Sequence, residues 1–236
     1  MNHRKICIVT GTRADWGILS AVAKALNERP DVTLQIVATN MHLSEKFGST
    51  WHEIERDGLH IDRMVPMAVN TDSAVDTVVA MSQCMDGMAR TLSDLQPDLL
   101  LILGDRYEML AVASTALILR IPIAHIAGGA VSRGAYDESI RHSITKMSHI
   151  HLTETEEYRR RVIQLGENPA NVHNVGAMGV YNIHHLQYPS REQLEAELGT
   201  SIPQNTLLCT FHPATLETIE PRIQFENLLA ALDRHP

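Results

Sequence analysis

Short apolar runs alternate with amphipathic stretches along most of this 236-residue chain. Runs of strand length occupy residues 5–10, 32–38, 61–65, 99–103, 121–126, 149–152 and 172–175. They are too short for helices, and the run at 99–103 is unbroken, which is typical of a strand that is buried on both faces. The alternation of such runs with helical patterns predicts an α/β fold with a doubly wound parallel sheet of about seven strands.

The stretches between these runs have apolar residues three and four positions apart, as in amphipathic helices. Helical patterns cover residues 18–26, 43–57, 73–95, 109–119 and 154–165, and a further helix begins at residue 137. Residues 70–73 read Asn-Thr-Asp-Ser, a loop made of residue types that cap helices. Pro97 ends the longest helix, because proline cannot continue one.

Strand and helix patterns are sparser after residue 175. Residues 176–179 predict a turn and residues 179–189 a linker, followed by helices at 190–198 and 221–232 and one strand at 206–211. One strand and two helices bury too little surface to form a core of their own. We therefore assign residues 1–180 to a first domain and residues 181–236 to a linker and the incomplete start of a second, and expect a shortened form of a longer protein.

Charged residues follow two of the predicted strands. Asp105 and Arg106 come directly after the run at 99–103, and Asp137 and Arg141 open the helix that follows the run at 121–126. Ligands of open α/β sheets bind outside the carboxyl ends of the strands, so these positions favour a functional site. The alternative is that these residues have only structural roles. Asp105 and Asp137 could each cap a helix, and Asp137 and Arg141, which are four residues apart, could form an ion pair on the surface.

The first predicted strand leads into a glycine-containing turn, Gly11 to Gly17, and then a helix. A helix start that follows such a turn offers free N–H groups and a positive dipole end to a phosphate. Arg13 lies in this turn and could bind a diphosphate through two parallel hydrogen bonds, or lie exposed on a loop. The turn lacks the G-x-G-x-x-G dinucleotide fingerprint. His42 ends the second predicted strand and is equally compatible with an ordinary loop histidine.

Composition narrows the class of protein. The formal net charge of -8 argues against a nucleic-acid partner, which requires a basic face. Cys7, Cys84 and Cys209 are widely spaced in apolar segments and predict buried thiols of a reducing compartment.

The sequence shows no signal peptide and no run of about 18 apolar residues that would span a membrane, so we expect a cytoplasmic protein. His149 and His151 alternate, but no nearby carboxylate or cysteine completes a metal site.

Eight motifs of this chain resemble, in the same order, those of the hydrolysing UDP-N-acetylglucosamine 2-epimerases of sialic acid synthesis. Their relatives that make legionaminic-type sugars, some from GDP-linked or modified substrates, share these motifs. The motifs are TGTRADWG, NMHLSEKFGSTW, LGDRYEMLA, HIAGG, YDESIRHSITKMSHIHL, EEYRRRVIQLGE, VGAMG and FHPATLE. The resemblance extends over essentially the whole chain.

The resemblance implies two Rossmann-like domains of the glycosyltransferase-B type, with this chain carrying the N-terminal one. It implies elimination of the nucleoside diphosphate to give a 2-acetamidoglucal, followed by addition of water. The products would be free N-acetylmannosamine, or an analogue, and UDP or GDP. No cofactor, NAD or metal would take part, and the protein would be a homodimer or homotetramer.

Site residues carry over position by position. Asp105 and Asp137 match the family's catalytic acids, and which of them removes the weakly acidic C2 proton stays open. Arg13, His42 and His212 match positions near the nucleotide and diphosphate, beside Gly17 in the first turn. His212 is also a candidate acid for the leaving group. Arg141 would orient Asp137 or contact substrate.

Two positions depart from the family pattern. Some members have Glu where this chain has Ala127, and many bacterial relatives have Glu at the position of Ala130. An alanine cannot carry a proton, so a second hypothesis is a truncated, non-catalytic relative that retains only a dimer-forming first domain. A third, an NAD-dependent dehydrogenase, is disfavoured by the missing glycine fingerprint.

Overall fold

The computed structural model describes residues 3–69, 73–213 and 217–234, so the predicted capping loop lies mostly outside the described residues. The chain divides into two units. The first comprises Met1–Val131 and Asp137–Ile183, and the second Ser132–Tyr136 and His184–Pro236. The sheet and all residues around its carboxyl edge that are described below belong to the first unit.

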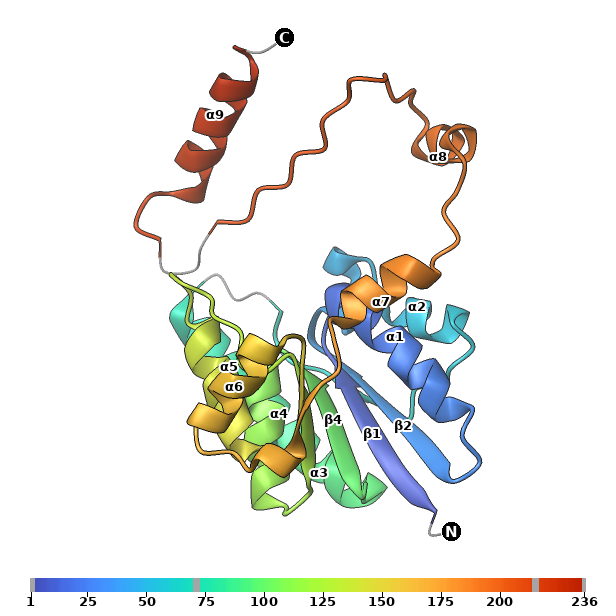
Figure 1. Ribbon diagram of the computed structural model, residues 1–236, viewed down its shortest axis with the longest axis vertical. Helices are drawn as coiled ribbons and strands as arrows, with labels where there is room; N and C mark the ends of the chain where they lie inside the picture. The colour runs from blue at the N-terminus through green and yellow to red at the C-terminus, as the bar shows by residue number, and fades with distance from the viewer. Residues whose placement is uncertain (1–2, 70–72, 214–216, 235–236) are drawn as a thin grey trace. The chain divides into compact units, whose positions relative to one another are not determined.

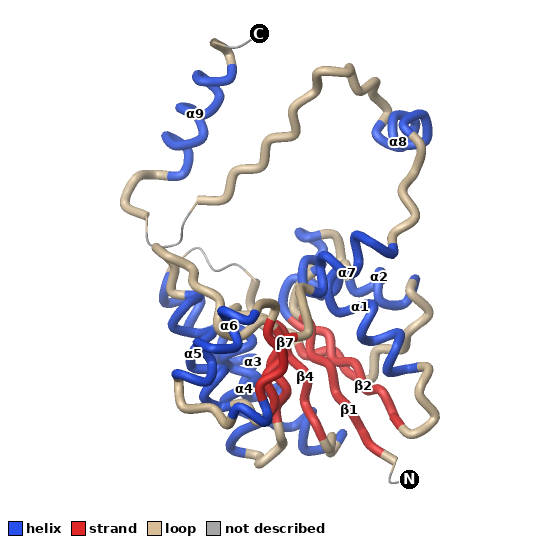
Figure 2. The backbone as a smooth tube through the Cα atoms, in the orientation of Figure 1, coloured by secondary structure: helices blue, strands red, loops and turns tan. Residues whose placement is uncertain are grey.

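The first unit is built on a seven-stranded sheet in the order β3-β2-β1-β4-β5-β6-β7, with every neighbouring pair parallel. Figure 2 shows the strands in red, with helices in blue beside them. In chain order the strands are β1 Arg4–Thr10, β2 Val32–Thr39, β3 Arg63–Val65, β4 Leu99–Leu103, β5 Ile123–Ile126, β6 Ile150–Thr153 and β7 Val172–Asn174. The seven predicted strands and the doubly wound parallel sheet are thereby confirmed. The chain reverses its direction of travel across the sheet between β1 and β4, which makes this the topological switch point.

Helices cover both faces of the sheet. They are α1 Arg13–Asn27, α2 Trp51–Arg56, α3 Ala74–Leu95, α4 Tyr107–Ile118, α5 Asp137–Met147, α6 Glu156–Gln164 and α7 Met178–His185. Figure 1 shows α1 and α2 beside one face and α3, α4 and α5 beside the other.

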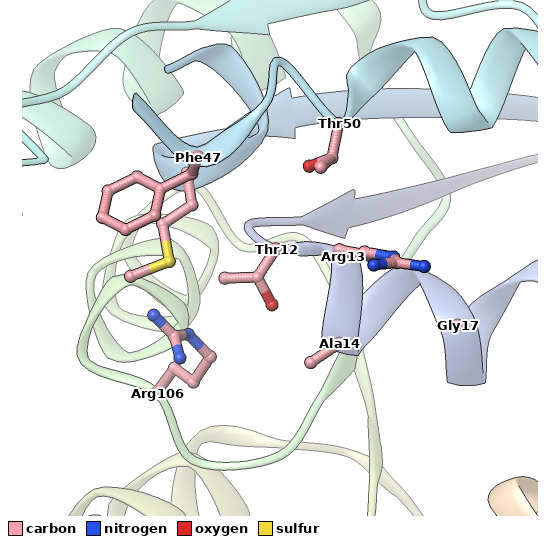
Figure 3. Close-up of a pocket in the computed structure, with 8 residues that line it drawn as sticks. Thr12, Arg13, Ala14, Gly17, Phe47, Thr50 and Arg106 are labelled. Atoms are coloured by element: carbon pink, nitrogen blue, oxygen red, sulfur yellow. The ribbon is translucent and has the colours of Figure 1, made fainter. Parts of the chain in front are cut away.

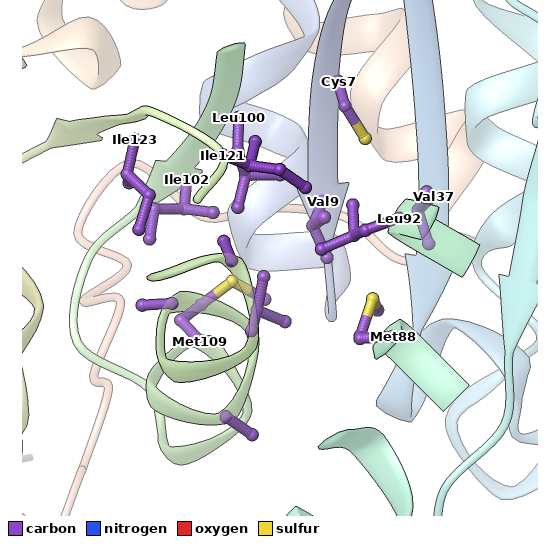
Figure 4. Packing of buried hydrophobic residues seen from close by; sticks show 14 of the residues in the cluster. Cys7, Val9, Val37, Met88, Leu92, Leu100, Ile102, Met109, Ile121 and Ile123 are labelled. Atoms are coloured by element: carbon purple, nitrogen blue, oxygen red, sulfur yellow. The ribbon is translucent and has the colours of Figure 1, made fainter. Parts of the chain in front are cut away.

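Each face has its own core. Ile8 of β1 packs with the α1 side, whereas its neighbours Cys7 and Val9 pack with the α3 and α4 side. Figure 4 shows this second core, in which Met88 and Met109 lie against the sheet. Because both faces are buried, both sets of alternating residues must be apolar, which explains the unbroken apolar runs of the sequence.

The helix predicted over residues 43–57 is confirmed only over residues 51–56, which form α2. Two short 3₁₀ turns, Asn40–Leu43 and Glu45–Phe47, precede α2 instead. Gly48 and Ser49 separate them from α2 with φ of 85° and 47°, a left-handed backbone that interrupts a right-handed helix.

In the second unit, the predicted helices are confirmed as α8 Arg191–Leu198 and α9 Pro221–Leu232. The strand predicted over residues 206–211 is absent, because no described segment pairs with it and a lone strand leaves its N–H and C=O groups unsatisfied. Residues 178–185 at the start of the predicted linker form α7. Cys7 and Cys84 are buried as predicted, but Cys209 is exposed, because the segment around it packs into no core.

Candidate active site

Two cavities lie at the carboxyl edge of the sheet, beside the switch point. The first has a volume of about 550 Å³ and is formed by the turn after β1, the segment after β2 and the turn after β4 (Figure 3). Its lining residues are Thr12, Arg13, Ala14, Gly17, Met41, Phe47, Thr50 and Arg106. Its size is in the range of small-molecule sites.

The second cavity has a volume of about 250 Å³ and is rich in charge. Its lining residues are Asp15, Ile18, Leu103, Gly104, Asp105, Arg106, Ala127, Ala130, Arg141 and Glu154. They come from the ends of β4, β5 and β6 and from α1 and α5. Arg106 lines both cavities.

The turn after β1 has the predicted strand–turn–helix geometry. Thr12 caps α1, and the Asp15 carboxylate accepts hydrogen bonds from the amides of Gly11 and Thr12 at 3.2 and 3.0 Å. Burial, and then the nearby charge of Glu108, raise the pKa of Asp15. Because Asp15 occupies these two amides, the turn has fewer donors for an anion than the sequence pattern implies.

Arg13 lies at the surface. Its side chain is 75% exposed, and its Nε lies 3.2 Å from Oε1 of Glu53. Gly17 lines the first cavity, and its carbonyl accepts a hydrogen bond from Asn182 of α7 at 2.6 Å. The nucleotide-binding roles of Arg13 and Gly17 stay predictions.

His42 is fully buried beneath the first cavity wall. Its Nε2 lies 3.0 Å from Oγ1 of Thr10, and its Nδ1 lies 2.8 Å from Oγ1 of Thr50. Burial lowers the pKa of His42 to about 4, so the ring is neutral at physiological pH. His42 does not line the cavity. It contacts Thr50, which does.

Asp105 and Arg141 form an ion pair in the second cavity. The Arg141 side chain is 6% exposed and also donates from Nη1 to the carbonyl of Ala130 at 2.8 Å. Burial lowers the pKa of Arg141. The sequence suggested Asp137 as the carboxylate that Arg141 orients, whereas in the structure the arginine fixes Asp105.

Asp137 and His212 are the remaining predicted residues. Asp137 is the half-buried first residue of α5 and lines neither cavity. His212 belongs to the second unit, where it is exposed in a stretch without regular structure. The catalytic roles assigned to both residues stay predictions.

The two alanines that depart from the family pattern both line the second cavity. Ala127 has a φ of 65°, a conformation that costs a non-glycine residue energy and that clusters at ligand sites. Because Ala127 and Ala130 carry only methyl groups, the acidic side chains that line this cavity are those of Asp15, Asp105 and Glu154.

Sequence reasoning noted Arg106 at the carboxyl end of a strand without giving it a role, and it missed Glu108 and Glu154. Glu154 directly follows β6, so the rule that selected Asp105, a charge at the carboxyl end of a strand, would also have selected it. Arg106 stands beside Asp105 in the same turn. Glu108 lies within an apolar helix start, and nothing in the pattern distinguishes it from a surface residue.

Among the residues that the structure describes, no three His, Cys, Asp or Glu side chains are grouped so as to hold a metal ion. No helix within the described ranges has both the length and the apolar character to cross a membrane.

The fold and the paired cavities define an α/β protein with a candidate ligand site at the switch point of its sheet. Residues 24–236 match the family model described as UDP-N-acetylglucosamine 2-epimerase. The chain belongs to this family.

Curated relatives extend the match to nearly the whole chain. A GDP/UDP-N,N'-diacetylbacillosamine 2-epimerase (hydrolyzing) of Campylobacter jejuni is 40% identical over 233 residues, covering 99% of this chain and 60% of that protein. The polysialic acid biosynthesis protein P7 of Escherichia coli is 42% identical over 229 residues, covering 97% and 58%. The chain thus spans about 60% of the length of these relatives.

Solved structures agree on the fold. The UDP-GlcNAc 2-epimerase of Neisseria meningitidis, bound to UDP-GlcNAc, superposes with a TM-score of 0.68 at 18% identity, covering 76% of this chain and 48% of that one. A putative UDP-N-acetylglucosamine 2-epimerase of Listeria monocytogenes gives 0.71 at 18% identity, covering 82% and 52%.

Proposed function

We propose that this chain is the N-terminal part of a hydrolysing 2-epimerase that acts on a UDP- or GDP-linked N-acetylhexosamine. The substrate is UDP-N-acetylglucosamine or a modified analogue, such as the diacetylbacillosamine sugar in the names of the relatives from Campylobacter jejuni and Legionella pneumophila. The product enters nonulosonic (sialic-type) acid synthesis in the cytoplasm, and the protein is a homodimer or homotetramer.

One observation carries the proposal: a carboxylate, Asp105, is held by a buried arginine in a small charged cavity that adjoins a larger one. The larger cavity suits the nucleoside diphosphate and the smaller one the sugar. A fixed carboxylate beside C2 is what proton removal from a weak carbon acid requires.

The reaction is an elimination followed by a hydration. A carboxylate takes the C2 proton, the C1–O bond breaks with its electron pair passing to the diphosphate, and a C1–C2 double bond forms. Water then adds its oxygen to C1, and a proton returns to C2 on the opposite face. Asp105 and Asp137 are the proposed acid–base groups, with His212 as the proposed proton donor to the leaving oxygen.

Protein purified from its natural source tests the proposal, after its intact mass has been measured. The protein is incubated in D₂O with UDP-N-acetylglucosamine, with UDP-diacetylbacillosamine and with the GDP forms, and the products are followed by NMR. We expect nucleoside diphosphate and free 2-epimeric sugar in equal amounts, with one deuterium at C2. A nucleotide-linked mannose epimer, or a free sugar of unchanged configuration without deuterium, contradicts the proposal.

A non-catalytic relative is the second candidate, and the two cavity-lining alanines favour it. Ala130→Glu in the same polypeptide discriminates between the two functions. Activity that appears only in the variant supports the non-catalytic alternative, whereas wild-type turnover rejects it.

A further inference from the structure

The three acidic side chains that line the second cavity differ in what already binds them. Asp105 is paired with the buried Arg141, and Asp15 accepts two hydrogen bonds from backbone amides. The Glu154 carboxylate makes no hydrogen bond and no ion pair with any group that the structure describes. Glu154 can therefore gain or lose a proton without breaking an interaction of the folded chain.

The backbone is held on both sides of Glu154. Thr153, the last residue of β6, is buried, and its hydroxyl donates to the carbonyl of His173 on β7 at 3.2 Å. Thr155 is the N-cap of α6, and its hydroxyl accepts a hydrogen bond from the amide of Tyr158 at 3.1 Å. Because this strand–helix junction is fixed, the half-buried Glu154 side chain starts from a defined position at the cavity wall.

Asp105 and Glu154 occupy matching positions on the two strands that flank β5. Leu103 of β4 pairs in register with Ile126 of β5, and Ile126 pairs with Leu152 of β6. Asp105 and Glu154 each lie two residues beyond this row. Neighbouring strands are about 4.8 Å apart, so the ends of β4 and β6 are separated by roughly 10 Å.

The middle strand contributes only small side chains between these two carboxylates. Ala127 and Ala130 follow β5 and line the same cavity, whose volume is about 250 Å³. In glycosidases, two carboxyl groups flank a sugar at about 6.5–9.5 Å when a water molecule must also enter. The strand order therefore places one carboxylate on each side of the space that the proposed function gives to the sugar.

Inversion at C2 requires proton transfer on both faces of the sugar, because one proton leaves from one face and another arrives on the opposite face. Asp105 suits removal of the proton, since Arg141 stabilises its charged form. It is a poor store for a proton, because protonated Asp105 leaves a buried guanidinium without its counter-ion. The group that returns a proton must hold one between steps, and Glu154 can do so without that penalty.

We propose that Glu154 is a further catalytic residue, which delivers the new proton to C2 on the face opposite Asp105. This inference rests on the proposed function and assigns one step of its hydration half. It adds a third acid–base group to Asp105 and Asp137.

The proton transfers balance over the two half-reactions. In the elimination, Asp105 accepts the C2 proton as the C1–O bond breaks. In the hydration, the electron pair of the C1–C2 double bond takes the proton of the protonated Glu154 and forms the new C2–H bond, and the oxygen of water bonds to C1. The proton that this water loses passes to Glu154, and Asp105 releases the original C2 proton to solvent.

Separate assays of the two half-reactions test the inference, on protein produced at the length found for the natural polypeptide. Release of nucleoside diphosphate from the sugar nucleotide measures elimination. Conversion of added 2-acetamidoglucal, derived from the same sugar, to the free 2-acetamido sugar measures hydration. The readout is the ratio of the two rates, because a general defect in folding slows both alike.

We expect Glu154→Gln to retain elimination within about threefold of the wild type and to slow hydration about 10- to 100-fold, at the lower end of general acid catalysis because water reaches this half-buried position. The 2-acetamidoglucal then accumulates beside the nucleoside diphosphate. Glu154→Asp retains a carboxylic acid and should recover part of the hydration rate. Glu156→Gln is the matched control, because Glu156 lies exposed in the first turn of α6, where it pairs with Arg159. Both of its rates should equal those of the wild type.

The inference is overturned if Glu154→Gln hydrates the 2-acetamidoglucal at the wild-type rate, or if it loses elimination and hydration in equal proportion. A wild type that cleaves no sugar nucleotide but hydrates the 2-acetamidoglucal rejects the proposed function, and loss of that hydration in Glu154→Gln still supports the inference. A wild type that does neither overturns both.

Discussion

His125 of β5 is fully buried and connects two segments that form the second cavity. Its Nε2 donates to the carbonyl of Gly104 at 2.7 Å, which leaves Nδ1 as an acceptor 3.3 Å from Oγ1 of Thr145. Gly104 precedes Asp105, and Thr145 lies one turn after Arg141 on α5, where its one O–H faces both Nδ1 of His125 and the carbonyl of Arg141, the latter at 2.9 Å. The ring thus braces both halves of the Asp105–Arg141 pair.

Burial lowers the pKa of His125 from 6.5 to about 4. Between these values the unfolded chain takes up a proton that the folded chain does not. The stabilising effect of the neutral ring is therefore complete above about pH 6.5 and is lost as the pH falls toward 4. From the two pKa values, the contribution of His125 to the free energy of unfolding at pH 4.5 is lower by about 2–3 kcal/mol than at pH 7.5.

The perturbation is His125→Gln, whose amide can still donate to Gly104 but does not titrate. We expect the variant to be about 1–2 kcal/mol less stable at pH 7.5 and the deficit to shrink by about 2–3 kcal/mol at pH 4.5, so that the order of stability reverses. Carboxylates and His42 contribute equally to both proteins and cancel in the difference.

Urea unfolding between pH 7.5 and 4.5 measures this difference. Trp16 and Trp51 report the first unit by fluorescence, because both tryptophans of the chain lie in it. The matched control, His60→Gln on the exposed surface, should parallel the wild type at every pH. The reasoning would be refuted if the difference in free energy of unfolding between the wild type and His125→Gln stayed constant within about 0.5 kcal/mol over this pH range.

Three further substitutions test the site. Gly11→Ala places a Cβ 2.6 Å from Oε1 of Glu108, so we expect the free energy of unfolding to fall by about 1–3 kcal/mol; an unchanged urea midpoint would show that the carboxylate can move aside. Arg141→Met removes the ion-pair partner of Asp105. We expect the free energy of unfolding to fall by about 1–3 kcal/mol, which is less than for a fully buried pair because Asp105 is 24% exposed. We also expect kcat to fall at least tenfold, and retained turnover would exclude a role for the pair. Glu154→Gln should change stability by less than about 0.5 kcal/mol and lower kcat about 10- to 100-fold, and equal rates would remove this carboxylate from the chemistry.

Local patterns predicted most of the sheet and failed where the outcome depended on a neighbour. The run at 99–103 became β4 because both its faces are covered, and any strand buried in this way must be apolar throughout. The run at 206–211 is also largely apolar, but no strand lies beside it among the described residues, and it joins no sheet there. A strand is stable only with a partner, and one segment's composition carries no information about whether a partner exists.

In the candidate site, too, local pattern predicted one feature and failed for another that depends on a residue distant in sequence. The position of Asp105 at a cavity follows from the rule that ligands bind at the carboxyl ends of parallel strands. Its partner does not follow, because Arg141 is 36 residues away in sequence and also stands four residues from Asp137 on one helix. Proximity in sequence favoured the second pairing, and the structure contains the first.

The sequence by itself determined the alternation of strands and helices, the family and the edge of the sheet where chemistry is expected. These follow from short-range properties: side-chain periodicity, helix capping and motif order. The tertiary structure decided the strand order, which places the turns after β1 and β4 side by side, and it decided the charge partners. It paired Asp105 with Arg141 and left the Glu154 carboxylate without a partner among the described residues, because residues far apart in sequence meet only once the sheet is assembled, an outcome that no local pattern encodes.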